Sequence, residues 1–214
     1  MEFAHVSLRA DRSVRILHRG KRLLEGFDPD LVNQLSDKTQ HLGPAIYLQS
    51  EVKAIEKCAR GLQVHALVAG TEKTFEADLV VHGAGRVPDI ENLDLTAAEV
   101  EAGNRGINVN DYLQSTSNSA AYAAGDVTAS VGAPLTPVAG YEGRIVAANL
   151  LRRNHVKPNY LGIPTVAFTI PPVASVGLSE QSARERGLKF RTHREVTSSW
   201  YSAEWQRIAQ GSRF

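Results

Sequence analysis

A run of small residues followed by a helix start constrains the fold of this 214-residue chain more than any other feature. Residues Tyr122–Asp126 predict a strand whose small side chains let another group approach the backbone, with Gly125 making the turn. Further along, Thr136 suits the N-cap of a helix and Pro137 its first position. The pattern predicts a strand, a turn and a helix whose positive N-terminus lies near Asp126.

Together, these two features favour a flavin site. Alone, Asp126 is as readily a turn aspartate as an acceptor for ribitol hydroxyls, and the helix start is simply a well-formed one. Side by side, the carboxylate can bind a ribitol chain, and the helix N-terminus can stabilise negative charge on a reduced flavin. The predicted flavin contacts are Gly125, Asp126, Thr136, Pro137, Val138 and Ala139.

The remaining pattern alternates helices and strands, which predicts an α/β fold. Helices are expected over 2–10, 29–42 (with Asp28 as N-cap), 93–100, 136–151 and 179–186. Strands or extended segments are expected over 13–17, 45–48, 61–68, 73–75, 78–82, 106–109, 120–124 and 165–169. A βα unit, a β-meander and a last strand before Gly83 fit the later part of a dinucleotide-binding domain.

Charge and composition narrow the functional classes. Lys and Arg total 24 against 23 Asp and Glu, so the net charge of +1 gives no electrostatic case for binding nucleic acid or an anionic membrane. No apolar run approaches the ~20 residues of a membrane span. The single cysteine, Cys58, is expected to be structural, and the seven histidines show no metal-ligand spacing. We therefore expect a soluble, cytoplasmic protein without a metal site.

Several motifs, in order, resemble the pyridine nucleotide–disulfide oxidoreductases, the family of glutathione reductase, dihydrolipoamide dehydrogenase and mercuric reductase. They are residues 85–88 (Gly-Arg-Val-Pro), 122–126, 135–139, 164–169 and 174–178. The resemblance implies a partial Rossmann-like NAD(P) domain over residues 1–88 and the C-terminal half of an FAD domain over 89–161. It also implies an incomplete α+β interface domain over 162–214, through which the full-length parent forms a homodimer.

The resemblance also implies what this stretch does not carry. It contains neither the family's Gly-rich FAD loop, nor its cysteine pair, nor its His-Glu pair, so no catalytic residue is assigned. We therefore expect a fragment of an FAD-dependent NAD(P)H:disulfide oxidoreductase that is inactive alone and binds FAD weakly. The alternatives are a flavin-dependent NAD(P)H oxidoreductase with another acceptor, which residues 164–178 argue against, and a non-catalytic dimerising remnant.

On the nicotinamide side, the resemblance assigns Glu2, Gly85 and Arg86 to the nucleotide pocket. The alternatives are a solvated Glu2 and a surface ion pair of Arg86. The strand ending at Leu17 is followed by the basic stretch 18–22, with no carboxylate before Glu25. Basic residues at this position suit a ribose 2′-phosphate, which predicts NADP(H) rather than NAD(H), with Arg19 as the phosphate partner. The alternative is a solvated basic loop.

Overall fold

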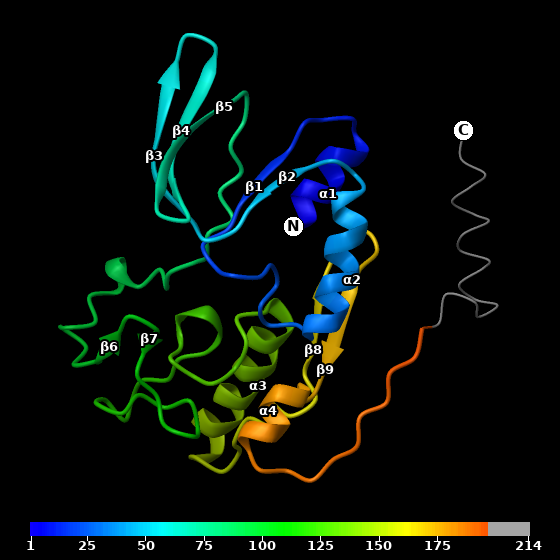
Figure 1. Ribbon diagram of the computed structural model, residues 1–214. Coiled ribbons are helices and arrows are strands. Elements are labelled where there is room, and N and C mark those ends of the chain that lie inside the picture. Colours follow the sequence, from blue (N-terminus) through cyan, green and yellow to red (C-terminus); the bar gives the residue numbers. More distant parts are fainter. Residues whose placement is uncertain (197–214) are drawn as a thin grey trace. The chain divides into compact units, whose positions relative to one another are not determined.

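The computed structural model describes residues 1–196 and divides the chain into two units, Met1–Gly177 and Leu178–Phe214 (Figure 1). The predicted last domain, 162–214, extends into residues 197–214, which lie outside the described part. Among the helices of residues 1–196, none is long and apolar enough to cross a bilayer.

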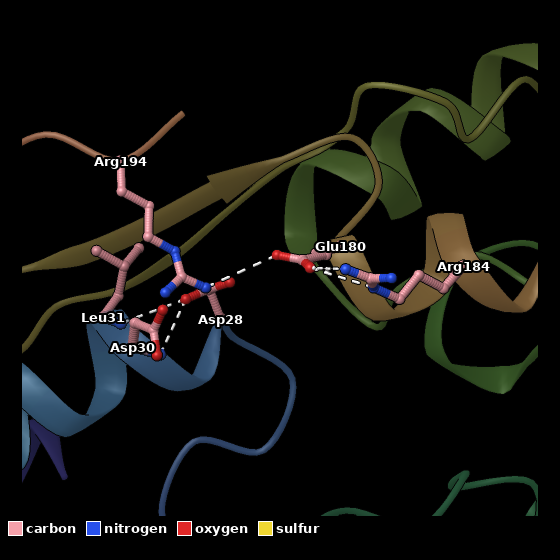
Figure 2. A network of polar contacts seen from close by, with 6 residues as sticks. All are labelled: Asp28, Asp30, Leu31, Glu180, Arg184 and Arg194. Atoms are coloured by element: carbon pink, nitrogen blue, oxygen red, sulfur yellow. Dashed lines mark hydrogen bonds and ion pairs between the residues drawn. The ribbon is translucent and has the colours of Figure 1, made fainter. Parts of the chain in front are cut away.

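The first unit opens with a βαβ arrangement. After helix α1 (Glu2–Arg9), strand β1 (Arg15–Leu17) pairs in parallel with β2 (Ala45–Tyr47). Helix α2 (Pro29–Gln40) connects the two strands. As predicted, Asp28 caps α2, its Oδ1 accepting from the N–H groups of Asp30 (2.9 Å) and Leu31 (3.4 Å; Figure 2). The predicted helices 2–10 and 29–42 are therefore confirmed, with ends shifted by one or two residues.

A three-stranded antiparallel meander follows. It consists of β3 (Ser50–Cys58), β4 (Gly61–Val68) and β5 (Thr71–Ala77), drawn in cyan to green in Figure 1. The expected strand over 78–82 is wrong. Leu79 is 76% exposed and Val81 54% exposed, and no described strand pairs with this segment. A strand forms only through bonds to a neighbour, so an apolar run without one stays irregular.

The next segment is mostly irregular. It holds the 3-10 turns η1 (Glu91–Leu93) and η2 (Gly125–Val127) and the hairpin of β6 (Ala102–Gly103) with β7 (Gly106–Ile107). The predicted helix 93–100 is wrong, since Asp94 and Glu99 take left-handed φ values of 45° and 52°.

The predicted strand 120–124 is also wrong. Its described pairing is a single isolated bridge between Gln114 and Tyr122. A strand needs a continuous ladder of hydrogen bonds to a neighbour, and one bridge does not supply it. The run of small residues that leads into Gly125 is therefore extended without being part of a sheet.

Helix α3 (Thr136–Arg152) confirms the predicted helix, but Thr136 is not its N-cap. The helix begins at Thr136 itself, Leu135 occupies the cap position, and no side chain caps the N-terminus. The buried stripe of α3 consists of Val138, Glu142, Ile145 and Asn149. Half of this stripe is polar, so these side chains need internal hydrogen-bond partners.

Strands β8 (Pro164–Ala167) and β9 (Val173–Val176) form an antiparallel pair that ends the first unit. In the second unit, helix α4 (Glu180–Glu185) starts at Ser179, whose hydroxyl accepts from Ser182 N–H (3.1 Å). Its first residue, Glu180, pairs with Arg184 and, at 3.7 Å, with Arg194 (Figure 2).

The imidazole of His5 joins separate segments of the first unit. It is fully buried, with Nε2 2.9 Å from Thr39 Oγ1 and Nδ1 3.1 Å from both the backbone N and O of Ile170. The Thr39 hydroxyl donates to Leu35 O (2.7 Å), so its oxygen accepts from the imidazole Nε2–H. A neutral ring then accepts the Ile170 N–H at Nδ1. The neutral tautomer satisfies both ring nitrogens.

This geometry predicts a pH-dependent stability. Burial lowers the pKa of His5, partly opposed by the Ile170 carbonyl, while the N-terminal amine and Arg9 lower it further. As the pH falls, His5 therefore binds a proton in the unfolded chain before it does so in the folded chain. The free energy of unfolding is highest above about pH 6.5 and decreases as the pH drops toward the pKa of His5 in the folded state. Urea unfolding from pH 7 to pH 5 should show a steeper loss for the wild type than for His5→Asn.

The matched control is His82→Asn, which removes an exposed imidazole. It should retain the wild-type dependence on pH. Equal pH dependence in the wild type and His5→Asn would refute the role given to the buried ring.

Candidate functional site

The turn at Gly125 meets the first turn of α3, as the sequence pattern predicts. Gly125 has a φ of +77°, and a Cβ built on it would lie 2.9 Å from the Ala139 Cβ. Glycine is needed here both for its backbone conformation and for the space beside Ala139. Thr136 and Pro137 are exposed at the uncapped start of α3, whereas the Val138 side chain is buried.

Asp126 and Arg86 form an ion pair. Arg86 Nη1 lies 2.9 Å from Asp126 Oδ2, and Arg86 Nη2 donates to Pro134 O (2.7 Å). The Asp126 side chain is 39% exposed and that of Arg86 69% exposed. Two residues that the sequence assigns to different ligands, the flavin and the nicotinamide, are thus in direct contact.

These residues line one cavity of about 430 Å³. Its wall includes Gly85, Arg86, Arg105, Gly125 and Asp126, together with residues before and within α3. The guanidinium of Arg105 donates to a backbone carbonyl in this wall, Ser130 O (2.8 Å). The cavity thus presents hydrogen-bond donors and the Asp126 carboxylate to a polar ligand, and the buried Glu142 also belongs to its lining. Another hollow, of about 540 Å³ and within residues 184–192, contains none of the predicted site residues.

A buried carboxylate beneath the cavity is the residue that sequence reasoning missed. Glu142 is 1% exposed. Its Oε2 accepts from Gly125 N–H (2.6 Å), and its Oε1 accepts from the hydroxyls of Ser130 (2.9 Å) and Tyr160 (2.6 Å). The available signal was its spacing: Glu142 lies four residues after Val138, on the apolar face of the helix.

Glu2 lies apart from this cavity. Its Oε1 accepts from the backbone N–H of Phe168 (2.7 Å), just after β8, and it does not line the cavity. The structure thus brings Gly85, Arg86, Gly125 and Asp126 together but leaves Glu2 in a contact of its own. A role for Glu2 at a nicotinamide stays a prediction.

The basic side chains of residues 18–22, which follow β1, differ in whether they make hydrogen bonds within the described part of the chain. Arg22 donates to the carbonyls of Phe27 (3.1 Å) and Glu25 (3.0 Å), so it closes its own loop. Arg19 is exposed and makes no hydrogen bond or ion pair within residues 1–196. The Glu25 carboxylate lies against Gly20, where it would collide with an added Cβ. Although Glu25 does not follow β1 directly in the sequence, its carboxylate therefore lies beside the loop that leaves this strand.

The described residues do not form a side-chain cluster of the kind that binds metal ions in proteins. Within residues 1–196, no group of three or more His, Cys, Asp or Glu side chains could hold an ion. Cys58 is exposed at the end of β3.

Comparison with known proteins gives the family. The pattern of the pyridine nucleotide-disulphide oxidoreductases matches residues 1–143, and that of their dimerisation domain matches residues 163–212. The chain therefore belongs to the pyridine nucleotide-disulphide oxidoreductase family. The predicted family and the predicted α/β fold class, with Rossmann-like and dimerisation parts, are confirmed.

Its curated relatives include two enzymes of Staphylococcus aureus. Mercuric reductase is 37% identical over 180 residues, which cover 84% of this chain and 32% of the relative. Dihydrolipoyl dehydrogenase is 35% identical over 178 residues, which cover 83% of this chain and 37% of the relative. The chain thus spans about a third of the length of these relatives.

Solved structures show the same fold. LpdA from Mycobacterium tuberculosis aligns with a TM-score of 0.85 and 20% identity, over 96% of this chain and 44% of that one. The HOCl-induced flavoprotein disulfide reductase RclA from Escherichia coli aligns with a TM-score of 0.79 and 24% identity, over 95% and 46%. At these identities the likeness establishes the fold.

The close approach at Gly125 predicts a stability effect. Gly125→Ala should destabilise the chain by about 1–2 kcal/mol, because a left-handed φ is costly for alanine and the new methyl meets Ala139. Urea unfolding monitored by circular dichroism measures it. The control is Gly140→Ala in α3, where a Cβ has open space. It should stabilise the chain by about 0.5–1 kcal/mol. Equal midpoints for the two variants would contradict this account.

Proposed function

We propose that this chain supplies the flavin-facing wall and part of the nucleotide site of an FAD-dependent NAD(P)H oxidoreductase of the disulfide reductase class. One observation carries the proposal: Gly85, Arg86, Gly125 and Asp126 meet at one cavity beside the uncapped start of α3. We assign residues 1–88 to the NAD(P) part, 89–161 to the FAD part and 162–214 to a homodimer interface. The dimerisation-domain match over 163–212 supports the last boundary, whereas the match over 1–143 spans both the NAD(P) and FAD parts.

The residues present fit a flavin. The Gly125 turn packs against Ala139 with no side chain between them, and Gly125 and Asp126 line the cavity at this point. The partly exposed Asp126 carboxylate can accept hydrogen bonds from a polyol chain. Because no side chain within residues 1–196 caps α3, the N–H groups of Thr136 and Val138 in its first turn remain available to an electron-rich ring edge. These three features support Gly125, Asp126 and the segment 136–139 as flavin contacts.

When bound, FAD would supply two-electron transfer from NAD(P)H. The chain's own contribution would be to bind and orient the cofactor. Asp126 would accept from its ribitol hydroxyls, and the positive end of the α3 dipole would stabilise negative charge on the reduced ring. Arg86 Nη1 pairs with Oδ2 of Asp126, so a polyol at this carboxylate would either share it with the guanidinium or displace the guanidinium.

These residues do not include a pair of cysteines that could pass electrons from the flavin to a disulfide acceptor. Cys58 is the single cysteine of the 214 residues, so the chain alone cannot form an intrachain redox disulfide. We therefore propose that the chain by itself does not turn over NADPH with disulfides or Hg(II).

FAD binding tests the proposed function. Titration followed by flavin fluorescence should show binding to the wild-type chain. Asp126→Ala should weaken it by about tenfold or more, the equivalent of one or two hydrogen bonds made by a charged group. The control is Asp111→Ala, which removes another exposed, ion-paired aspartate, the partner of Lys157. No binding, or equal losses in the two variants, would refute the flavin assignment.

We further propose that NADP(H) is the preferred nucleotide and that Arg19 binds its 2′-phosphate. The Arg19 guanidinium is exposed and has no partner among residues 1–196, which supports this, since it can make a bidentate contact. The Glu25 carboxylate nearby is the competing feature, because a carboxylate accepts from a 2′-hydroxyl.

Arg19→Glu should lower affinity for NADPH about tenfold to a hundredfold relative to NADH, through loss of one charge-assisted contact. Competitive binding of the two nucleotides to this chain measures the ratio. Arg12→Glu, an equal charge change at another exposed arginine, is the control. An unchanged ratio in Arg19→Glu would leave Arg19 a solvated loop residue.

A further inference from the structure

The buried face of α3 carries a carboxylate where an apolar side chain would ordinarily lie. Glu142 is 1% exposed, and it is flanked on the same stripe by Val138 and Ile145. Burying a carboxylate is costly unless hydrogen bonds compensate for lost water. A side chain placed at this cost is expected to serve more than packing, and its partners show what it holds.

Each of the three described partners of Glu142 donates to it. The backbone N–H of Gly125 can only donate, whereas the hydroxyls of Ser130 and Tyr160 can donate or accept. An ionised carboxylate, which only accepts, matches this set of donors. Burial raises the pKa of the Tyr160 phenol, and the hydrogen bond to Glu142 raises it further, so the hydroxyl keeps its proton near neutral pH.

Close packing around the carboxylate fixes its position. A Cβ on Gly132 would lie 2.7 Å from the Tyr160 ring and 2.8 Å from Glu142 Oε1. The Gly132 N–H also donates to Ser130 Oγ (3.2 Å), which leaves the serine proton for the carboxylate. Residues 130, 132 and 160 thus form a cradle around one oxygen. The other oxygen is left for Gly125.

We propose that Glu142 is the positioning residue of the flavin side: held by Ser130 and Tyr160, it clamps the Gly125 N–H and thereby sets the Asp126 carboxylate. The proposal rests on the proposed flavin site. Asp126 follows Gly125 directly, so the turn that Glu142 holds is the one from which the Asp126 backbone departs. Glu142 belongs to the lining of the same cavity, but it is 1% exposed and both its oxygens accept hydrogen bonds from the protein, so in this proposal it acts through the turn.

Graded substitutions at Glu142 test the clamp. In Glu142→Gln, the new side chain can turn its single oxygen to Gly125 and its amide group to the two hydroxyls, which then accept. Glu142→Leu removes every acceptor. Affinity for FAD should fall about tenfold in Glu142→Leu and by less in Glu142→Gln. Tyr160→Phe, which leaves the carboxylate and the Gly125 contact in place, should lose least.

A second measurement does not depend on flavin. The amide proton of Gly125 should resonate far downfield in the wild type, because its bond to a carboxylate is short at 2.6 Å. It should move upfield in part in Glu142→Gln and fully in Glu142→Leu. If the wild type bound no FAD, the proposed function would fail, while the Gly125 resonance would still decide whether the clamp exists.

The matched control is Asn149→Leu on the same buried stripe of α3. Asn149 bonds to Tyr112 O (3.0 Å), Val156 O (2.9 Å) and the N–H groups that follow the helix, none of them at the flavin turn. It should lower stability in urea without moving the Gly125 resonance. Equal effects of Asn149→Leu and Glu142→Leu on that resonance, or wild-type FAD affinity in Glu142→Leu, would overturn the proposal.

Discussion

The buried carboxylate of Glu142 is the constraint on which the candidate site depends. A charge placed in the interior must be surrounded by donors, and here the donors come from three separate segments: the Gly125 turn, the loop at Ser130 and the segment at Tyr160. None of these segments belongs to a long strand or helix in the structure. Their common acceptor on α3 gives the irregular part of the chain a fixed geometry, which hydrophobic contacts alone would supply less specifically.

Much of the fold could be predicted where the signal is local. The pair Asp28 and Pro29 sets the start of α2, since capping depends on neighbouring residues alone. The alternation in residues 61–68 marks β4 because one of its faces is buried. Prediction failed where structure depends on distant partners. Residues 78–82 have the composition of a strand but no described neighbour, and Tyr122 makes a single bridge.

The candidate site shows the same division. Gly125 and Asp126 could be recognised because a turn glycine and a helix start occur at a fixed spacing. Glu142 was missed: its spacing from Val138 places it on the buried face of α3, but a glutamate on a helix is usually solvated, and its enclosure follows from the positions of Ser130 and Tyr160. The ion pair between Arg86 and Asp126 could not be predicted from the sequence either, because it joins two motifs that the family resemblance assigns to different ligands.

That ion pair has a consequence for how the cavity takes up a ligand. Arg86 pairs with Oδ2 of Asp126, so a neutral polyol that binds this carboxylate either shares it with the guanidinium or displaces the guanidinium. Where the guanidinium is displaced, the affinity for the ligand is the difference between two sets of contacts, and it takes on the salt sensitivity of the ion pair that is lost. Because both side chains are partly exposed, raising the ionic strength weakens the guanidinium's hold far more than it weakens uncharged hydroxyl contacts. A ligand that displaces Arg86 should therefore bind more tightly as the ionic strength rises.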